Sequence, residues 1–132
     1  MHPKSEGILE SSLYVEDLAR SARFYEKLFG FRVISSFAPR GCALEAGSRQ
    51  VLLLFLKNAS RSGPTPHHGD GELHLAFRIG REDIPAWEGW LAENGIAIEE
   101  RKAWELGGVS IYFRDPDRHL LEIATPGVWS IY

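Results

Sequence analysis

The fold is decided by residues 73–95, whose sequence is LHLAFRIGREDIPAWEGWLAENG, together with residues 8–30, whose sequence is ILESSLYVEDLARSARFYEKLFG. Each stretch begins with a short apolar or alternating run that is typical of a β-strand. An acidic pair follows, and its second member, Asp17 or Asp83, predicts the start of a helix because its side chain can accept hydrogen bonds from free amides. Gly30 or Gly95 then predicts the end of that helix. The pattern therefore predicts two copies of one strand–helix unit.

Further strands are expected after each helix. Turn-forming residues separate short apolar or alternating runs at residues 31–37, 42–46 and 50–56 in the first copy, and at residues 96–102, 109–114 and 120–124 in the second. This order predicts an α+β fold of two βαβββ units with mixed sheets that form a curved cleft. Unit one is expected at residues 8–57, a loop at 58–71 and unit two at 72–126. A chain of 132 residues has room for one compact domain of ordinary size, so residues 1–132 are assigned to a single domain.

The composition excludes several classes of function. The formal net charge is −3, which gives no basic excess to attract nucleic acid or an acidic membrane. The longest apolar run, residues 51–56, is far shorter than the roughly 18 residues of a membrane helix, and the N-terminus lacks the apolar core of a signal peptide. The single cysteine, Cys42, excludes an intrachain disulfide and a cysteine-based zinc site. We therefore expect a cytoplasmic protein that binds neither nucleic acid nor a membrane.

Three residues on the polar faces of the expected strands are candidate metal ligands. Strand alternation places Glu10, His74 and Glu122 opposite the apolar side chains of their strands. A carboxylate enclosed there loses several kcal/mol of hydration and needs a compensating cation. Imidazole with two carboxylates suits divalent Mn, Fe, Ni or Zn and leaves positions open for a substrate. Alternation alone leaves a second interpretation equally open, in which these residues are solvated and a glutamate pairs with Arg78 or Arg114.

Three motifs carry a resemblance to a known family. They are Tyr14-Val15-Glu16-Asp17-Leu18 with Leu28-Phe29-Gly30-Phe31, then His74-Leu75-Ala76-Phe77, and finally the stretch from Tyr112 to Glu122 that contains Asp115-Pro116-Asp117. Over about residues 8–126 the chain resembles the vicinal oxygen chelate superfamily, which includes glyoxalase I, extradiol dioxygenases, fosfomycin-modifying enzymes and bleomycin resistance proteins. The resemblance implies metal ligands at the positions of Glu10, Leu53, His74 and Glu122. Leu53 cannot bind a metal, so three ligands remain, and Glu10 stands where many relatives carry a His.

The resemblance also implies a function. It implies a metal-dependent enzyme that acts on a small oxygen-bearing substrate, by lyase, isomerase or thiol transferase chemistry rather than as a dioxygenase, which normally uses two His and one Glu. The candidate substrate-binding residues, some of which match the spacing of phosphonate-contacting residues in fosfomycin thiol transferases, are Ser12, Lys102, Trp104, Ser110, Tyr112 and Arg114. The alternative is a metal-free, drug-sequestering protein of the bleomycin resistance type. A homodimer is expected in either case, because sheets of this size leave edges that pairing would cover.

Several other residues keep two interpretations. His67 and His68 are expected to be polar loop residues rather than metal ligands. His119 precedes the strand of Glu122 and either steadies a ligand or stabilises the turn. Trp104 and Trp129 lie in loop-like segments, where they could form an apolar wall for a substrate or contact a second subunit.

Overall fold

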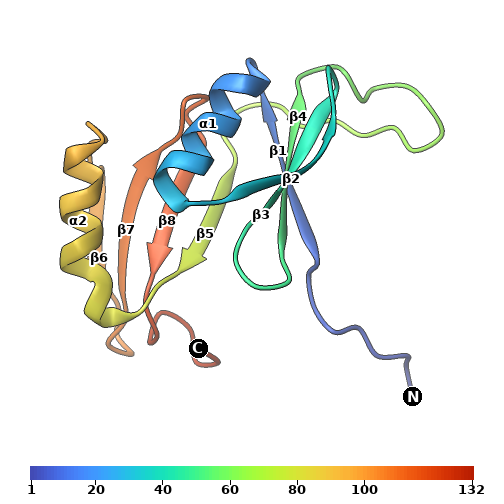
Figure 1. Cartoon of the computed structure of the whole chain (residues 1–132). Coiled ribbons are helices and arrows are strands. Elements are labelled where there is room, and N and C mark those ends of the chain that lie inside the picture. The colour runs from blue at the N-terminus through green and yellow to red at the C-terminus, as the bar shows by residue number, and fades with distance from the viewer. The chain divides into compact units, whose positions relative to one another are not determined.

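The structure, a computed structural model, describes residues 1–132 and divides into two compact units, Met1–Asp70 and Gly71–Tyr132. Each unit contains a four-stranded mixed sheet and one α-helix (Figure 1). The division falls near the end of the expected loop at residues 58–71. In both sheets the first strand of the unit lies parallel to its last strand. The predicted duplication of a βαβββ unit is therefore confirmed.

Unit one consists of β1 (Glu10–Val15), α1 (Leu18–Phe29), β2 (Arg32–Phe37), β3 (Gly41–Glu45) and β4 (Val51–Leu56). The sheet order is β1-β4-β3-β2, and β1 pairs with β4 in parallel while the other neighbours are antiparallel. Parallel neighbours need a long connection, which α1 and the β2–β3 hairpin provide here. The observed elements lie close to their predicted bounds.

Unit two consists of β5 (His74–Arg78), the short 3-10 helix η1 (Arg81–Asp83), α2 (Ile84–Glu93), β6 (Glu100–Ala103), β7 (Val109–Arg114) and β8 (Leu120–Ala124). The sheet order is β5-β8-β7-β6. The strand predicted at residues 96–102 begins at Glu100. Before it, the amide of Ile96 still bonds back to the Leu91 carbonyl oxygen of α2 at 2.9 Å, and the first amide that bonds to β7 is that of Glu99, at 2.8 Å from the Tyr112 carbonyl oxygen. Neither α1 nor α2 has the length and hydropathy that a membrane-spanning helix requires.

The two helices begin in different ways. In α1, Asp17 has an extended backbone and its carboxylate accepts a hydrogen bond from the Arg20 amide at 3.0 Å, as predicted. In α2, Asp83 makes no such bond, so the prediction that it caps the helix is wrong. The chain enters α2 through η1, which gives Asp83 a helical backbone, whereas a capping side chain needs an extended one. Gly30 and Gly95 both have the left-handed backbone expected at a helix end, with φ of 70° and 68°.

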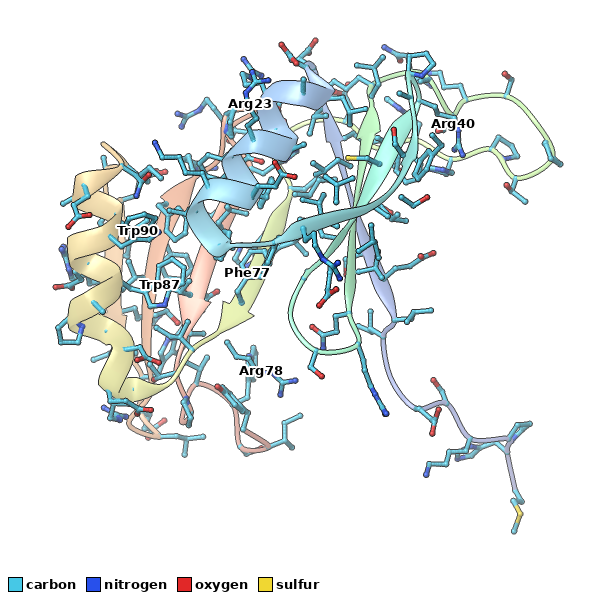
Figure 2. All side chains as sticks on the ribbon, in the orientation of Figure 1. Arg23, Arg40, Phe77, Arg78, Trp87 and Trp90 are labelled. Carbon is cyan, nitrogen blue, oxygen red and sulfur yellow. The ribbon has the colours of Figure 1, made fainter.

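Each sheet has one face covered by its helix. The apolar positions on that face are almost fully buried, and they are Leu13, Val15, Leu52 and Leu54 in unit one and Ile111, Phe113, Leu121 and Ile123 in unit two. In unit two an ion pair of 2.8 Å between Glu88 of α2 and Arg101 of β6 joins the helix to the sheet. Trp87 and Trp90 extend from the same helix toward the strands (Figure 2). Alternation therefore predicted correctly which side chains face the helix.

The opposite, helix-free face of each sheet carries the predicted functional residues. In unit one this face includes Glu10, Ser12, Tyr14, Leu53 and Phe55. In unit two it includes His74, Lys102, Ser110, Tyr112, Arg114 and Glu122. The strand register thus gathers several polar side chains on one surface of unit two.

Candidate functional site

Two of the predicted ligands, His74 and Glu122, lie side by side on the helix-free face of unit two. In the parallel pair of β5 and β8, His74 lies opposite Leu120 and Ala76 lies opposite Glu122. This register brings the Nε2 atom of His74 within 3.2 Å of the Oε1 atom of Glu122. Glu122 is only 6% exposed, whereas His74 is exposed. The sheet therefore presents an imidazole nitrogen beside a buried carboxylate, and the site is reached by solvent from the His74 side.

The hydrogen bonds of His74 determine which ring nitrogen carries the proton. Its Nδ1 atom lies 2.8 Å from the carbonyl oxygen of Leu120, which can only accept, so Nδ1 is the donor. In the neutral ring Nε2 then presents a lone pair to Glu122, and two electron-rich atoms this close repel unless they share a proton or a metal cation. Metal-binding histidines usually have such a carbonyl partner on the far nitrogen. The pair therefore has the donor chemistry of part of a metal site.

The second carboxylate oxygen of Glu122 is bound from within the unit. Ser110 donates from its Oγ atom to Oε2 of Glu122 at 2.5 Å. The indole Nε1 of Trp104 donates to the same Ser110 Oγ at 2.8 Å. Ser110 is fully buried, and the Nζ atom of Lys102 lies 4.2 Å from the centre of a ring of Trp104. Three of the predicted substrate-side residues thus form one connected group next to Glu122.

Tyr112 adds a hydrogen-bond donor to this surface. Its ring centre lies 6.3 Å from that of His74. Loss of hydration, and after it the negative charge of Glu122, raises the pKa of Tyr112. The phenol therefore stays protonated at neutral pH, and its hydrogen-bond partners are the side chains of Ser110 and Glu122.

The arginines of unit two have partners other than the Glu122 carboxylate. Arg114 pairs with Glu99, with 2.5 Å between Nε and Oε2, and this hydrogen bond lowers the pKa of Glu99. The guanidinium of Arg78 lies 5.6 Å from the centre of the Tyr132 ring. The interpretation in which an arginine neutralises this glutamate is therefore wrong for Glu122.

Glu10, the third predicted ligand, belongs to unit one together with Ser12. Glu10 is the first residue of β1, where it is exposed and lies opposite Val51. No three His, Cys, Asp or Glu side chains of residues 1–132 form a group that could hold a metal. The predicted three-ligand set therefore stays a prediction, and it requires that a Glu10 carboxylate reach the His74–Glu122 pair.

The loop at residues 58–71 is attached to the helix-free face of unit one. The Nδ1 atom of His67 lies 2.8 Å from the hydroxyl oxygen of Tyr14, and the ring of His67 lies 4.5 Å from that of Phe55. The ring of His68 lies 5.4 Å from that of Tyr14, and its Nδ1 atom is buried. The description of both histidines as simple polar loop residues is thus incomplete. The sequence feature that would have predicted these contacts is the aromatic pair Tyr14 and Phe55, which lies on the helix-free face of unit one, where the two histidines pack against it.

His119 stabilises the turn that leads into β8. It is 1% exposed, its Nδ1 accepts a hydrogen bond from the Leu73 amide at 2.9 Å, and its own amide donates to Oδ1 of Asp115 at 2.8 Å. These bonds hold the start of β5 against the turn before β8. The sequence left open whether His119 steadies a ligand or stabilises the turn, and the structure supports the turn. Because this turn joins β5 to β8, it also helps to place His74 beside Glu122.

Comparison with known families identifies the kind of protein. The family model of the Glyoxalase/Bleomycin resistance protein/Dioxygenase superfamily matches residues 7–123. The chain belongs to this superfamily. The match includes Glu10 in unit one and both members of the His74–Glu122 pair in unit two.

Among the relatives in this superfamily are two thiol transferases. The chain is 33% identical over 124 residues to the metallothiol transferase FosB of Bacillus licheniformis, an alignment that covers 93% of this chain and 77% of that protein. It is 31% identical over 112 residues to the glutathione transferase FosA of Serratia marcescens, covering 85% of this chain and 75% of that protein. A solved structure, the lactoylglutathione lyase from Agrobacterium tumefaciens, superposes with a TM-score of 0.90 at 25% identity and covers 97% of this chain and 99% of that one. The predicted superfamily and fold are therefore confirmed.

Proposed function

We propose that this protein is a metal-dependent enzyme that transfers a thiol to a small, oxygen-bearing substrate. The support from the comparisons is that relatives at 33% and 31% identity are named metallothiol transferase and glutathione transferase. In such a reaction the sulfur of the thiol bonds to carbon, a carbon–oxygen bond opens, and the released oxygen takes up a proton. An epoxide that also carries an anionic group, such as fosfomycin, is a substrate of this class.

The observation that carries the proposal is the contact between His74 and Glu122. The Nε2 atom of His74 and the Oε1 atom of Glu122 lie 3.2 Å apart, on a strand pair where no arginine neutralises the carboxylate. We propose that a divalent ion (Mn, Fe, Ni or Zn) binds these two atoms and that the carboxylate of Glu10 is the third ligand, from unit one of the same chain or of a second subunit. When bound, the ion supplies a positive charge that polarises a substrate oxygen.

The chain's own residues would orient the substrate around this site. The phenol of Tyr112, kept protonated, can donate to a substrate oxygen. Lys102 can supply a positive charge to an anionic group, and Ser12 lies on the corresponding face of unit one. Trp104, Ser110 and Arg114 remain proposed members of the substrate side, although Arg114 already binds Glu99.

We also propose that the protein is a homodimer. In each sheet the first strand of the unit, β1 or β5, is an edge strand, and β2 or β6 is the other edge. Edge strands present free amides and carbonyls that pairing with another chain can satisfy. The size of the particle in solution, measured by light scattering, tests this part separately.

Metal analysis of protein purified without chelator tests the central proposal. The wild-type chain should carry about one ion per site, and His74→Gln, Glu122→Gln and Glu10→Gln should each lose most of it, because each removes a charged or nitrogen ligand. Glu93→Gln, which removes the same charge from the exposed end of α2, is the matched control.

The reaction itself is followed as loss of free thiol when glutathione or cysteine is mixed with fosfomycin and the metal-loaded protein. If the wild-type chain carries no stoichiometric ion and consumes no thiol, the proposal that it is a metal-dependent thiol transferase is refuted. Tight binding of an aromatic, cationic drug that persists in chelator would instead support the metal-free, sequestering alternative.

A further inference from the structure

We propose that Trp104 is a positioning residue that sets the orientation of the Glu122 carboxylate through the hydroxyl of Ser110. This inference deepens the proposed function and rests on it, because the oriented carboxylate is the one proposed to bind the ion. The geometry consists of two consecutive hydrogen bonds, 2.8 Å from Trp104 Nε1 to Ser110 Oγ and 2.5 Å from Ser110 Oγ to Glu122 Oε2.

The direction of both bonds is fixed by chemistry. An indole N–H can only donate, so Ser110 must accept from Trp104. A serine hydroxyl has one proton, and an ionised carboxylate only accepts, so that proton lies between Ser110 and Glu122. The two hydrogen bonds therefore run in the same direction, from Trp104 through Ser110 to the buried carboxylate, which also has a hydrogen bond with Tyr112.

The burial of these groups makes the orientation matter. Ser110 is fully buried and Glu122 is 6% exposed, so water does not readily replace either bond. Because Oε2 is bound to Ser110, Oε1 is the oxygen that faces Nε2 of His74. Without the indole N–H, Ser110 keeps its hydrogen bonds with Glu122 and Tyr112 but loses the donor that fixes its hydroxyl from the other side, so the Glu122 carboxylate is held less firmly beside His74.

The ring of Trp104 has a second contact that separates packing from hydrogen bonding. Lys102 lies with Nζ 4.2 Å from the ring centre, an interaction that needs an aromatic face but no N–H group. Trp104→Phe therefore keeps an aromatic side chain beside Lys102 and removes the donor to Ser110. Trp90→Phe, at a partly exposed position of α2, is the matched control.

The first experiment observes the chain of bonds without any metal. The protein has four tryptophans, so a nitrogen–proton NMR spectrum shows up to four indole signals, and the one missing in Trp104→Phe belongs to Trp104. In metal-free protein, Ser110→Ala and Glu122→Gln should each move the Trp104 signal and leave that of Trp90 in place. A Trp104 signal that ignores both substitutions overturns the inference.

The second experiment measures Mn²⁺ binding to the full chain by titration calorimetry. Ser110→Ala should weaken Mn²⁺ binding about tenfold, the lower end of what loss of an outer partner of a ligand costs. Trp104→Phe should weaken it about threefold, since one neutral hydrogen bond further out is lost. The double variant should bind no worse than Ser110→Ala alone, because Trp104 acts only through that hydroxyl.

The outcomes separate the two proposals. Mn²⁺ binding by the wild type that is unchanged in Trp104→Phe overturns the positioning role and leaves the proposed function intact. Equal losses from Trp104→Phe in the wild-type and Ser110→Ala backgrounds also overturn it, because they indicate a general packing effect. A wild-type chain that binds none of Mn²⁺, Fe²⁺, Ni²⁺ and Zn²⁺ overturns the proposed function, whereas the hydrogen bonds from Trp104 to Glu122 are still decided by the NMR spectra of the metal-free protein.

Discussion

Mn²⁺ should raise the thermal midpoint of unfolding of the wild-type chain by about 10 °C when the free ion is at about a hundred times its dissociation constant. At that ratio, a ligand that binds only the folded state adds about 2.7 kcal/mol to the free energy of unfolding. The entropy of unfolding is about 2.1 cal/mol/K per residue, so 132 residues that unfold together have about 0.28 kcal/mol/K. The quotient of these two quantities is the expected shift. Calorimetry or dye fluorescence at a fixed heating rate measures it, and excess chelator should reverse it.

The decisive comparison is Glu122→Gln. The amide has nearly the same size and keeps an oxygen that can accept from Ser110, so the variant should fold, yet it removes the negative charge beside His74. Its thermal midpoint should therefore rise by less than about 2 °C when Mn²⁺ is added under the same conditions, compared with about 10 °C for the wild type. Glu93→Gln loses an equal charge from an exposed position and should keep the full shift. If Glu122→Gln rises as much as the wild type, the ion binds elsewhere and the reasoning from the His74–Glu122 contact is refuted.

Three further predictions concern the scaffold that carries the site. Asp17→Ala should lower the free energy of unfolding by about 0.5–2 kcal/mol in a denaturant titration, because its capping hydrogen bond is lost. Asp83→Ala loses no such bond and should lower it clearly less. Equal losses would contradict the capping geometry. Gly108→Ala should be severely destabilising, because its new Cβ atom would lie 2.2 Å from a backbone nitrogen. In Gly89→Ala, within α2, the new Cβ atom meets nothing within 4 Å, and the free energy of unfolding should rise by about 0.5–1 kcal/mol. A stable Gly108→Ala would show that this segment can move away. Burial raises the pKa of the Cys42 thiol and leaves it 4% exposed, so a thiol reagent should label Cys42 far more slowly in the native than in the denatured protein, and equal rates would contradict the burial.

The arrangement of strands could be predicted because alternation is a local property of the sequence. A residue such as Glu122, between Leu121 and Ile123, must face away from a helix that buries its neighbours. Asp17 likewise caps α1 as its position before the helix predicts. Asp83 did not, because its backbone is set by the 3-10 turn before α2, and nothing in an acidic pair distinguishes a turn that continues into the helix from a cap that precedes it.

The hydrogen bonds around Glu122 could not be predicted, because they depend on the turn between β6 and β7. The sequence placed Ser110 on the correct face but gave no reason to bring Trp104, six positions earlier, to its hydroxyl. In the structure the amide of Trp104 bonds to the Gly108 carbonyl at 2.8 Å, which returns the chain and directs the indole onto β7. Spacing along a strand is encoded locally, whereas a contact across a turn depends on its length and on the close approach that glycine allows.

The duplication explains why the two units contribute unequally to the proposed site. Ser12 lies opposite Leu53 in unit one as Ala76 lies opposite Glu122 in unit two, so Leu53 and Glu122 occupy equivalent places in two sheets of the same topology. A carboxylate at that place is buried and therefore costly unless hydrogen bonds and a cation compensate it. Unit two provides such support for Glu122, whereas unit one has an apolar side chain that requires none. What unit one retains is Glu10 at the exposed start of its first strand, where a charge costs little until an ion is present. In the proposed site the buried carboxylate of Glu122 would therefore need the hydrogen bonds that unit two supplies, whereas the exposed carboxylate of Glu10 would need none before the ion binds.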